Sequence, residues 1–222
     1  MRIGLFGGTF NPIHRCHLAI AAQTRNRLSL DRVVFIPSGD PPHKPSESLV
    51  PAKHRFEMVG RAIEPDPFFA ISDVEVRQAA KSYSIDTVRT LQKQYGPAAE
   101  LFFIIGLDAF QELPSWKQAP DLLRSCHFVV VSRPGVEFLS LCDMPLLPTI
   151  GRASLAALDA RQQDRLDIAI PNGTGLTLLR LPPCDISASE IRHRLKNRLS
   201  LSDLLPAPVE SYIIQHGLYS RS

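Results

Sequence analysis

The amino-acid sequence predicts an α/β protein whose mostly parallel sheet is doubly wound, with helices on both faces. Two observations carry this prediction. Strand-like and helix-like segments alternate along the chain, and several of the strand-like runs are apolar at almost every position. Continuous apolar runs of about 4–8 residues are typical of parallel strands that are covered on both faces.

The expected elements follow in chain order. The first apolar run stops at Gly7-Gly8, and the runs RVVFI, LFFII and HFVVVS indicate buried strands. Gly96-Pro97 ends the third helix, whereas prolines exclude a helix from the loop at 37–45. We expect strands at residues 2–6, 32–36, 68–72, 101–105, 127–132 and 176–181. We expect helices at residues 16–28, 52–63, 84–95, near 153–163, 187–196 and 208–216. The succession predicts a Rossmann-like sheet, in which a ligand lies beyond the carboxyl ends of the strands.

The domain organisation is predicted to be simple. We expect one domain over residues 1–222, with 136–175 as an insertion or loop excursion and 185–222 as a C-terminal helical segment. A hydrophobic content of 44% and a net charge of +3 exclude disorder. The apolar runs are far shorter than the ~20 residues that a membrane span needs. We therefore expect a cytoplasmic protein without membrane or nucleic-acid partners, and a homo-oligomer stays open.

The four cysteines carry no recognisable motif. Cys16, Cys126, Cys142 and Cys184 are widely spaced, which argues against a zinc knuckle or a thioredoxin-type pair. We expect them to be free thiols that pack as small hydrophobic residues.

The segment GGTFNPIHRCH follows the first strand directly and carries the strongest chemical signal. Gly7 and Gly8 let backbone amides approach an anion closely, and the Thr9 hydroxyl adds a donor. The following helix directs its N-terminus at the same space, which favours phosphate. His14 and His17 are three residues apart, so both imidazoles can reach one phosphate. The pattern differs from G-x-G-x-x-G, and no carboxylate or cysteine stands at a spacing that suits a metal.

A second signal lies near the C-terminus, in ISASEIR. Ser187 is a good helix N-cap, with Glu190 placed to complete a capping box. Arg192 is a cation in the first helical turn, where the helix dipole disfavours it. An anionic ligand at this helix start would resolve the conflict.

These two segments together resemble the nucleotidyltransferases with the T/H-x-G-H signature, and most closely the bacterial nicotinate-nucleotide adenylyltransferases. The resemblance covers residues 1 to about 134 and 185 to 217. The segments SYSIDT at 82–87 and RPG at 133–135 also resemble that family. Cys16 departs from the pattern, because the family usually has glycine there.

The resemblance implies a role for each motif residue, with His14 and His17 as the catalytic pair. It implies an ATP site formed by Gly7, Gly8, Thr9, Phe10, His14, His17, Gly106, Asp108, Ser187, Ser189 and Arg192. It implies a mononucleotide site formed by His43, Lys44, Tyr83, Ser84, Thr87, Trp116 and Arg133. Trp116 is the sole tryptophan and lies in a polar stretch, so its ring is suited to stack on a pyridine.

The implied reaction transfers the AMP part of ATP to nicotinate mononucleotide and releases pyrophosphate. Mg²⁺ would arrive with ATP and take few protein ligands. One alternative is another adenylyl- or cytidylyltransferase acting on nicotinamide mononucleotide, phosphopantetheine or glycerol phosphate. Another is a non-catalytic nucleotide sensor, in which Cys16 is the disabling change. A nicotinamide-dependent oxidoreductase is disfavoured because its glycine fingerprint is absent.

Overall fold

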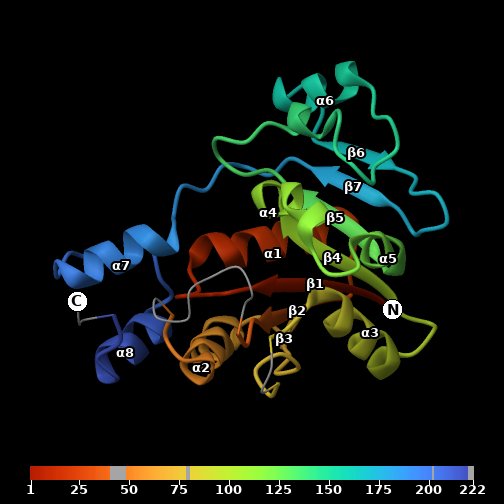
Figure 1. The fold of residues 1–222 in the computed structure, drawn as a ribbon. Helices are drawn as coiled ribbons and strands as arrows, with labels where there is room; N and C mark the ends of the chain where they lie inside the picture. Colours follow the sequence, from red (N-terminus) through yellow and green to blue (C-terminus); the bar gives the residue numbers. More distant parts are fainter. Residues whose placement is uncertain (41–48, 79–80, 202, 220–222) are drawn as a thin grey trace.

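The computed structural model describes residues 1–40, 49–78, 81–201 and 203–219. Its centre is a seven-stranded sheet in the order β3-β2-β1-β4-β5-β7-β6 (Figure 1). The strands are β1 (Arg2–Gly8), β2 (Arg32–Pro37), β3 (Phe69–Ile71), β4 (Glu100–Gly106), β5 (His127–Val131), β6 (Arg165–Ile168) and β7 (Leu176–Leu179). Neighbouring strands run parallel except β6, which pairs antiparallel with β7 at the edge.

Helices fill the connections between the strands. They are α1 (Arg15–Leu28), α2 (Ala52–Ile63), α3 (Ser84–Tyr95), α4 (Leu107–Gln111), α5 (Ala119–Ser125), α6 (Arg152–Asp159), α7 (Ala188–Lys196) and α8 (Ala207–Gln215). Two short 3₁₀ helices cover Leu113–Ser115 and Phe138–Leu141. The predicted α/β class is confirmed, and α2 and α3 begin and end where the sequence places them. The helices α4 and α5 and the strand β6 were not predicted.

Both faces of the sheet are buried, as the apolar runs indicate. On β4, Leu101, Phe103 and Ile105 point into a core that α3, α4, α5 and α6 cover. Phe102 and Ile104 point into a second core that α1, α2, α7 and α8 cover. Alternate side chains thus point into opposite layers, and helices on both faces exclude water from the sheet.

The strand order changes direction between β1 and β4, the first strand and the fourth. Loops that leave the carboxyl ends of two such strands diverge and open a crevice between them. In Figure 1, the carboxyl end of β1 points toward α7 and α8. The C-terminal helices therefore lie beside the loop that follows β1.

The segment at 136–175, predicted as an insertion or loop excursion, contains a 3₁₀ helix, α6 and β6. The carboxylate of Asp159, at the end of α6, accepts hydrogen bonds from the backbone N–H groups of Phe138 and Leu139. Through β6, the segment also adds the antiparallel edge strand to the sheet.

The expectation of four free thiols is wrong for two of the cysteines. Cys16, in the first turn of α1, forms a disulfide with Cys184, in the loop before α7. The fold brings their Cα atoms to 5.7 Å although 168 residues separate them in sequence. The spacing of the cysteines along the sequence does not indicate that these two would pair. Cys126 and Cys142 are free.

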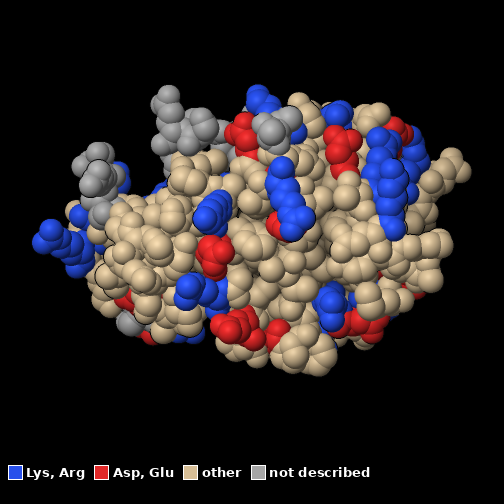
Figure 2. Space-filling model, turned by 90° about the horizontal axis from the view of Figure 1, so that it is seen from below, with Lys and Arg blue, Asp and Glu red and all other residues tan. Residues whose placement is uncertain are grey.

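Within the described ranges, no helix is both long enough and apolar enough to cross a membrane. On the face drawn in Figure 2, basic and acidic side chains are interspersed.

Candidate active site

The loop after β1 is shaped by close packing of its aromatic residue. A Cβ at Gly8 would lie 2.9 Å from the ring of Phe10, so this position requires glycine. Phe10 has a φ of 47° and is buried against Phe6 and Phe35. The Phe10 side chain is therefore part of the core, and any contact with ATP would come from its backbone.

His14 and His17 lie face to face at the start of α1, with ring centroids 3.7 Å apart. The backbone N–H of His14 donates to Nδ1 of His17 at 3.2 Å. Since Nδ1 accepts, the neutral His17 ring carries its proton on Nε2 and can donate it to a ligand. Burial, with a smaller contribution from the charge of Arg133, lowers the pKa of His14 to about 4. His14 is therefore neutral at pH 7.

The carboxyl ends of β4 and β5 bring three predicted residues together. Asp108, in the first turn of α4, lies 3.5 Å from Nε of Arg133, which follows β5. A Cβ at Gly106 would lie 2.5 Å from a carboxylate oxygen of Asp108, so a larger residue there would displace that carboxylate. Asp108 was predicted for the ATP site and Arg133 for the mononucleotide site, and the ion pair places them beside each other.

Of the two hydrogen bonds of the capping box predicted at the start of α7, one forms. The Ser187 hydroxyl accepts a hydrogen bond from the backbone N–H of Glu190 at 3.1 Å. The other half of the predicted capping box is wrong. The Glu190 carboxylate instead accepts from Nε of Arg194, one turn further along the helix, at 2.7 Å.

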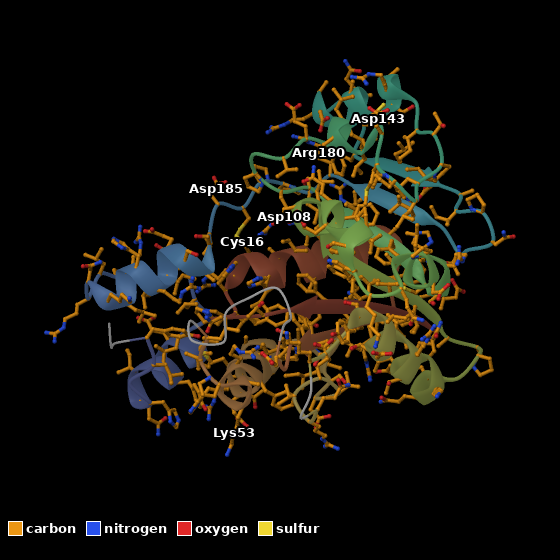
Figure 3. All side chains as sticks on the ribbon, in the orientation of Figure 1. Cys16, Lys53, Asp108, Asp143, Arg180 and Asp185 are labelled. Carbon is orange, nitrogen blue, oxygen red and sulfur yellow. A yellow bond between two sulfur atoms is a disulfide. The ribbon has the colours of Figure 1, made fainter. Side chains whose placement is uncertain are left out.

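Arg192 joins the two predicted phosphate-binding segments. One of its terminal nitrogens donates to the backbone carbonyl of Asn11 at 2.8 Å, and the other donates to the Ser189 hydroxyl at 3.1 Å. The Asn11 side-chain oxygen also accepts from the hydroxyl of Tyr219, near the C-terminus, at 2.8 Å. The disulfide is a second link, and Figure 3 shows Cys16 below the segment that carries Asp185. The serine–arginine turn thus lies beside the loop with the two histidines.

A cavity of about 1040 Å³ opens next to this junction. Its walls include the loop at 132–137, the segment at 180–184 and Ile20 of α1. Arg133, Arg180 and the disulfide-bonded Cys184 line it. The cavity is large enough for a nucleotide and begins where the β5 loop meets the tethered segment.

The predicted nicotinate-binding segment lies at the start of α3. Tyr83 is the N-cap residue, and Lys117 lies over its ring at 4.4 Å. Thr87 is buried, and its hydroxyl donates to the Glu75 carboxylate at 2.8 Å. The half-buried Trp116 packs edge-on against Phe103, with ring centroids 6.5 Å apart. Lys117 contacts Tyr83 and directly follows Trp116 in sequence. Trp116 therefore lies close to the start of α3, which includes Ser84.

His43 and Lys44, predicted for the mononucleotide side, lie outside the described residues. Among the residues that are described, no group of three or more His, Cys, Asp or Glu side chains could hold a metal ion.

A glycine-containing loop after β1, a histidine pair and a serine–arginine turn on a doubly wound sheet are the features that the sequence predicts for a nucleotidyltransferase. In agreement, the cytidylyltransferase-like family model matches residues 5–194. The chain is 43% identical to the probable nicotinate-nucleotide adenylyltransferase of Pelobacter propionicus, over 99% of both sequences. It is also 43% identical to the probable enzyme of the same name from Geotalea daltonii, again over 99% of both.

The chain therefore belongs to the cytidylyltransferase-like family and, within it, to the nicotinate-nucleotide adenylyltransferases. Its fold is also that of a solved structure, the Plasmodium falciparum nicotinic acid mononucleotide adenylyltransferase complexed with NaAD. The TM-score is 0.73 at 18% sequence identity, covering 100% of this chain and 98% of the other.

Sequence patterns gave no signal for three residues that the structure places around the site. Arg55 is buried and Glu75 is half-buried behind the loops, and Tyr219 reaches Asn11 from near the C-terminus. None lies within a motif. A charged residue on the apolar face of an amphipathic helix, as Arg55 is on α2, is the one pattern that could have marked it.

Proposed function

We propose that this chain transfers AMP from ATP to nicotinate mononucleotide, giving nicotinate adenine dinucleotide and pyrophosphate in NAD biosynthesis. A phosphate oxygen of the mononucleotide attacks the α-phosphorus of ATP and forms a new P–O bond. The bond from the α-phosphorus to the oxygen that bridges to the β-phosphorus breaks. Pyrophosphate leaves with that electron pair.

The protein's task in this reaction is to position two polyanions and to offset their charge. A phosphomonoester has its second pKa near about 6, so the attacking oxygen is ionised at pH 7 and needs no general base. The Nε2–H of His17 is suited to donate to the α-phosphate as charge builds there, with His14 stacked behind it. Arg192 and the amides near Ser187 and Ser189 would hold the other phosphates.

The other substrate would bind at the start of α3. Backbone and hydroxyl donors of Tyr83 and Ser84 are suited to the nicotinate carboxylate, and Trp116 to its ring. A carboxylate and a carboxamide differ by a full charge, so donors fixed in place can discriminate them. Thr87 would act through Glu75, because its hydroxyl is already engaged.

Mg²⁺ would be held by the phosphates of ATP, since the described residues offer no three-ligand site. When bound, the ion supplies positive charge at the triphosphate. The cytoplasmic location and a homo-oligomeric state stay predictions.

The observation that carries this proposal is the hydrogen bond from Arg192 to the carbonyl of Asn11, which joins the two segments predicted to bind phosphate. The test is pyrophosphate release with ATP and, in turn, nicotinate mononucleotide, nicotinamide mononucleotide and phosphopantetheine. We expect the highest kcat/KM with nicotinate mononucleotide and one dinucleotide formed per pyrophosphate. ATP binding without pyrophosphate release from any acceptor would indicate a non-catalytic protein.

A further inference from the structure

Arg55 is the largest fully buried side chain of the described chain, with 1% of its surface exposed. Its guanidinium donates to the backbone carbonyls of Thr9 at 2.8 Å, Gly39 at 2.8 Å and Val50 at 2.9 Å. The three carbonyls belong to the loop after β1, the loop after β2 and the approach to α2. A buried cation is tolerated only when its donors are satisfied, and here backbone oxygens satisfy it.

The contact with Thr9 orients the phosphate loop. In a trans peptide the C=O and N–H groups point in opposite directions. Arg55 holds the Thr9 carbonyl on its own side of the loop, so the N–H of Phe10 points to the other side. Arg192 donates to the carbonyl of Asn11, but the next residue is Pro12, which has no N–H to orient. The two guanidinium groups thereby fix two carbonyls of the loop.

Glu75 continues this network toward the start of α3. Its carboxylate accepts from the Thr87 hydroxyl at 2.8 Å and from the backbone N–H of Gly39. A Cβ at Gly39 would overlap the backbone carbonyl oxygen of Glu75, so the loops approach closely enough to require glycine. Gly39 thus donates to Glu75 and accepts from Arg55. The network runs from Thr9 through Arg55, Gly39 and Glu75 to Thr87.

The charges of Arg55 and Glu75 support each other. Burial lowers the pKa of Arg55, and the charges of Tyr219 and Glu75 oppose that shift. Burial raises the pKa of Glu75, and its hydrogen bonds with Thr87 and Gly39 and the charge of Arg55 oppose that shift. Removing either partner would leave the other with less compensation for its burial.

We propose that the buried Arg55 and the half-buried Glu75 form a brace that fixes the ATP-binding loop after β1 relative to the mononucleotide-binding start of α3. This inference rests on the proposed function. In-line attack requires the reacting atoms to be about 3–3.5 Å apart, and a misplacement of about 1 Å can cost ~10²-fold in rate. Arg55 is buried behind the loops and acts through their backbone, so it is a positioning residue.

The test is a set of three substitutions assayed with both substrate concentrations varied. Arg55→Met removes all three donors, and we expect kcat to fall ~10²-fold with KM raised for both substrates. Arg55→Lys keeps the charge but lacks the planar fork, so we expect a partial rescue, with kcat between that of Arg55→Met and the parent. Glu75→Gln keeps the shape, and we expect a smaller fall with both KM values raised.

Two substitutions on the same helix serve as controls. Lys53 projects away from the site into solvent (Figure 3), so Lys53→Met should retain the parent's kinetics. Met58 is fully buried but contacts no loop carbonyl by hydrogen bonding, so Met58→Ala should lower the melting temperature without lowering kcat in the folded range.

Unchanged kcat and KM in Arg55→Lys and Glu75→Gln would overturn the brace, even if Arg55→Met failed to fold. An equal loss of kcat in Met58→Ala would also overturn it, by showing that destabilisation alone explains the effect. A parent protein that is inactive with every acceptor would instead refute the proposed function, so the two failures are distinguishable.

Discussion

The two sides of the candidate site are held in place by different forces. Within α7, which carries the serine–arginine turn, only Ile191 is buried. Its position therefore depends on ties to the rest of the protein, chiefly the disulfide and the hydrogen bonds of Arg192. By contrast, α3 buries Ile85, Thr87, Val88 and Leu91, so core packing positions the proposed mononucleotide side.

The difference predicts how each side responds to change. A side that is tied by a few bonds moves when one tie is removed, whereas a packed side keeps its backbone and loses only the altered contact. Substitutions on the ATP side should therefore affect several ligand contacts together. Substitutions at Trp116 or Tyr83 should affect one substrate alone.

The largest expected effect is on the histidine pair, which lies on the proposed ATP side and, under the proposed function, acts on the chemical step. We expect His17→Ala to lower kcat ~10²-fold or more, because it removes a donor to the developing charge. Its melting temperature should change little. His193, exposed on α7, supplies the matched control His193→Ala. A kcat for His17→Ala within a few-fold of the parent would refute the catalytic role.

The second-largest expected effect tests the α3 side of the site, which core packing holds in place. Trp116→Ala should raise KM for nicotinate mononucleotide ~10-fold and leave KM for ATP nearly unchanged, because base–aromatic stacking is worth about 1–3 kcal/mol. Trp116→Phe keeps an aromatic plane and should recover most of the affinity. Steady-state kinetics with each substrate varied in turn measure this, and equal changes in both KM values would remove the stacking role.

A smaller effect should follow from loosening the tied side. Cys184→Ser removes the covalent link to α1, and we expect KM for ATP to rise several-fold with KM for the mononucleotide unchanged. A dithiol that reduces the disulfide of the parent, and is itself oxidised to a cyclic disulfide, should reproduce the change. The free Cys142 provides the control Cys142→Ser. Insensitivity of KM for ATP to both treatments would show that hydrogen bonds alone hold α7.

The smallest expected effect is a change of stability with pH, and it is absent above pH 7. His14 has a folded-state pKa of about 4 against 6.5 for the exposed ring. Between these values the unfolded chain binds the extra proton, so stability should fall as pH falls from 6.5 to 4. The variant His14→Gln should lose less stability over this window than the parent. Urea unfolding at several pH values measures the difference, and parallel curves for the two proteins would contradict the assignment.

Much of the fold follows from the sequence because the strands are apolar on both faces and the long helices have clear ends. The short elements escaped prediction for physical reasons. The helix α4 has five residues and α5 has seven, which is too few to show a helical period. Pro114 follows α4, and Pro120 lies within α5. The edge strand β6 is the short run RLDI, in which polar and apolar residues alternate over only four positions, too few to identify a strand.

The residues of the candidate site likewise divide into those that the sequence predicts and those that it does not. His14, His17, Ser187 and Arg192 lie in local motifs whose chemistry is legible, and the structure brings both motifs together. Arg55, Glu75 and the Cys16–Cys184 disulfide act between segments that are distant in sequence. Their roles depend on which loops meet in three dimensions, and no local pattern encodes that.

The most direct test of the account is a crystal structure with an ATP analogue that resists cleavage between the α- and β-phosphates. We expect one triphosphate to lie within hydrogen-bonding distance of both His17 Nε2 and the Ser187–Arg192 turn. Phosphates that contact only one of these two segments would contradict the account.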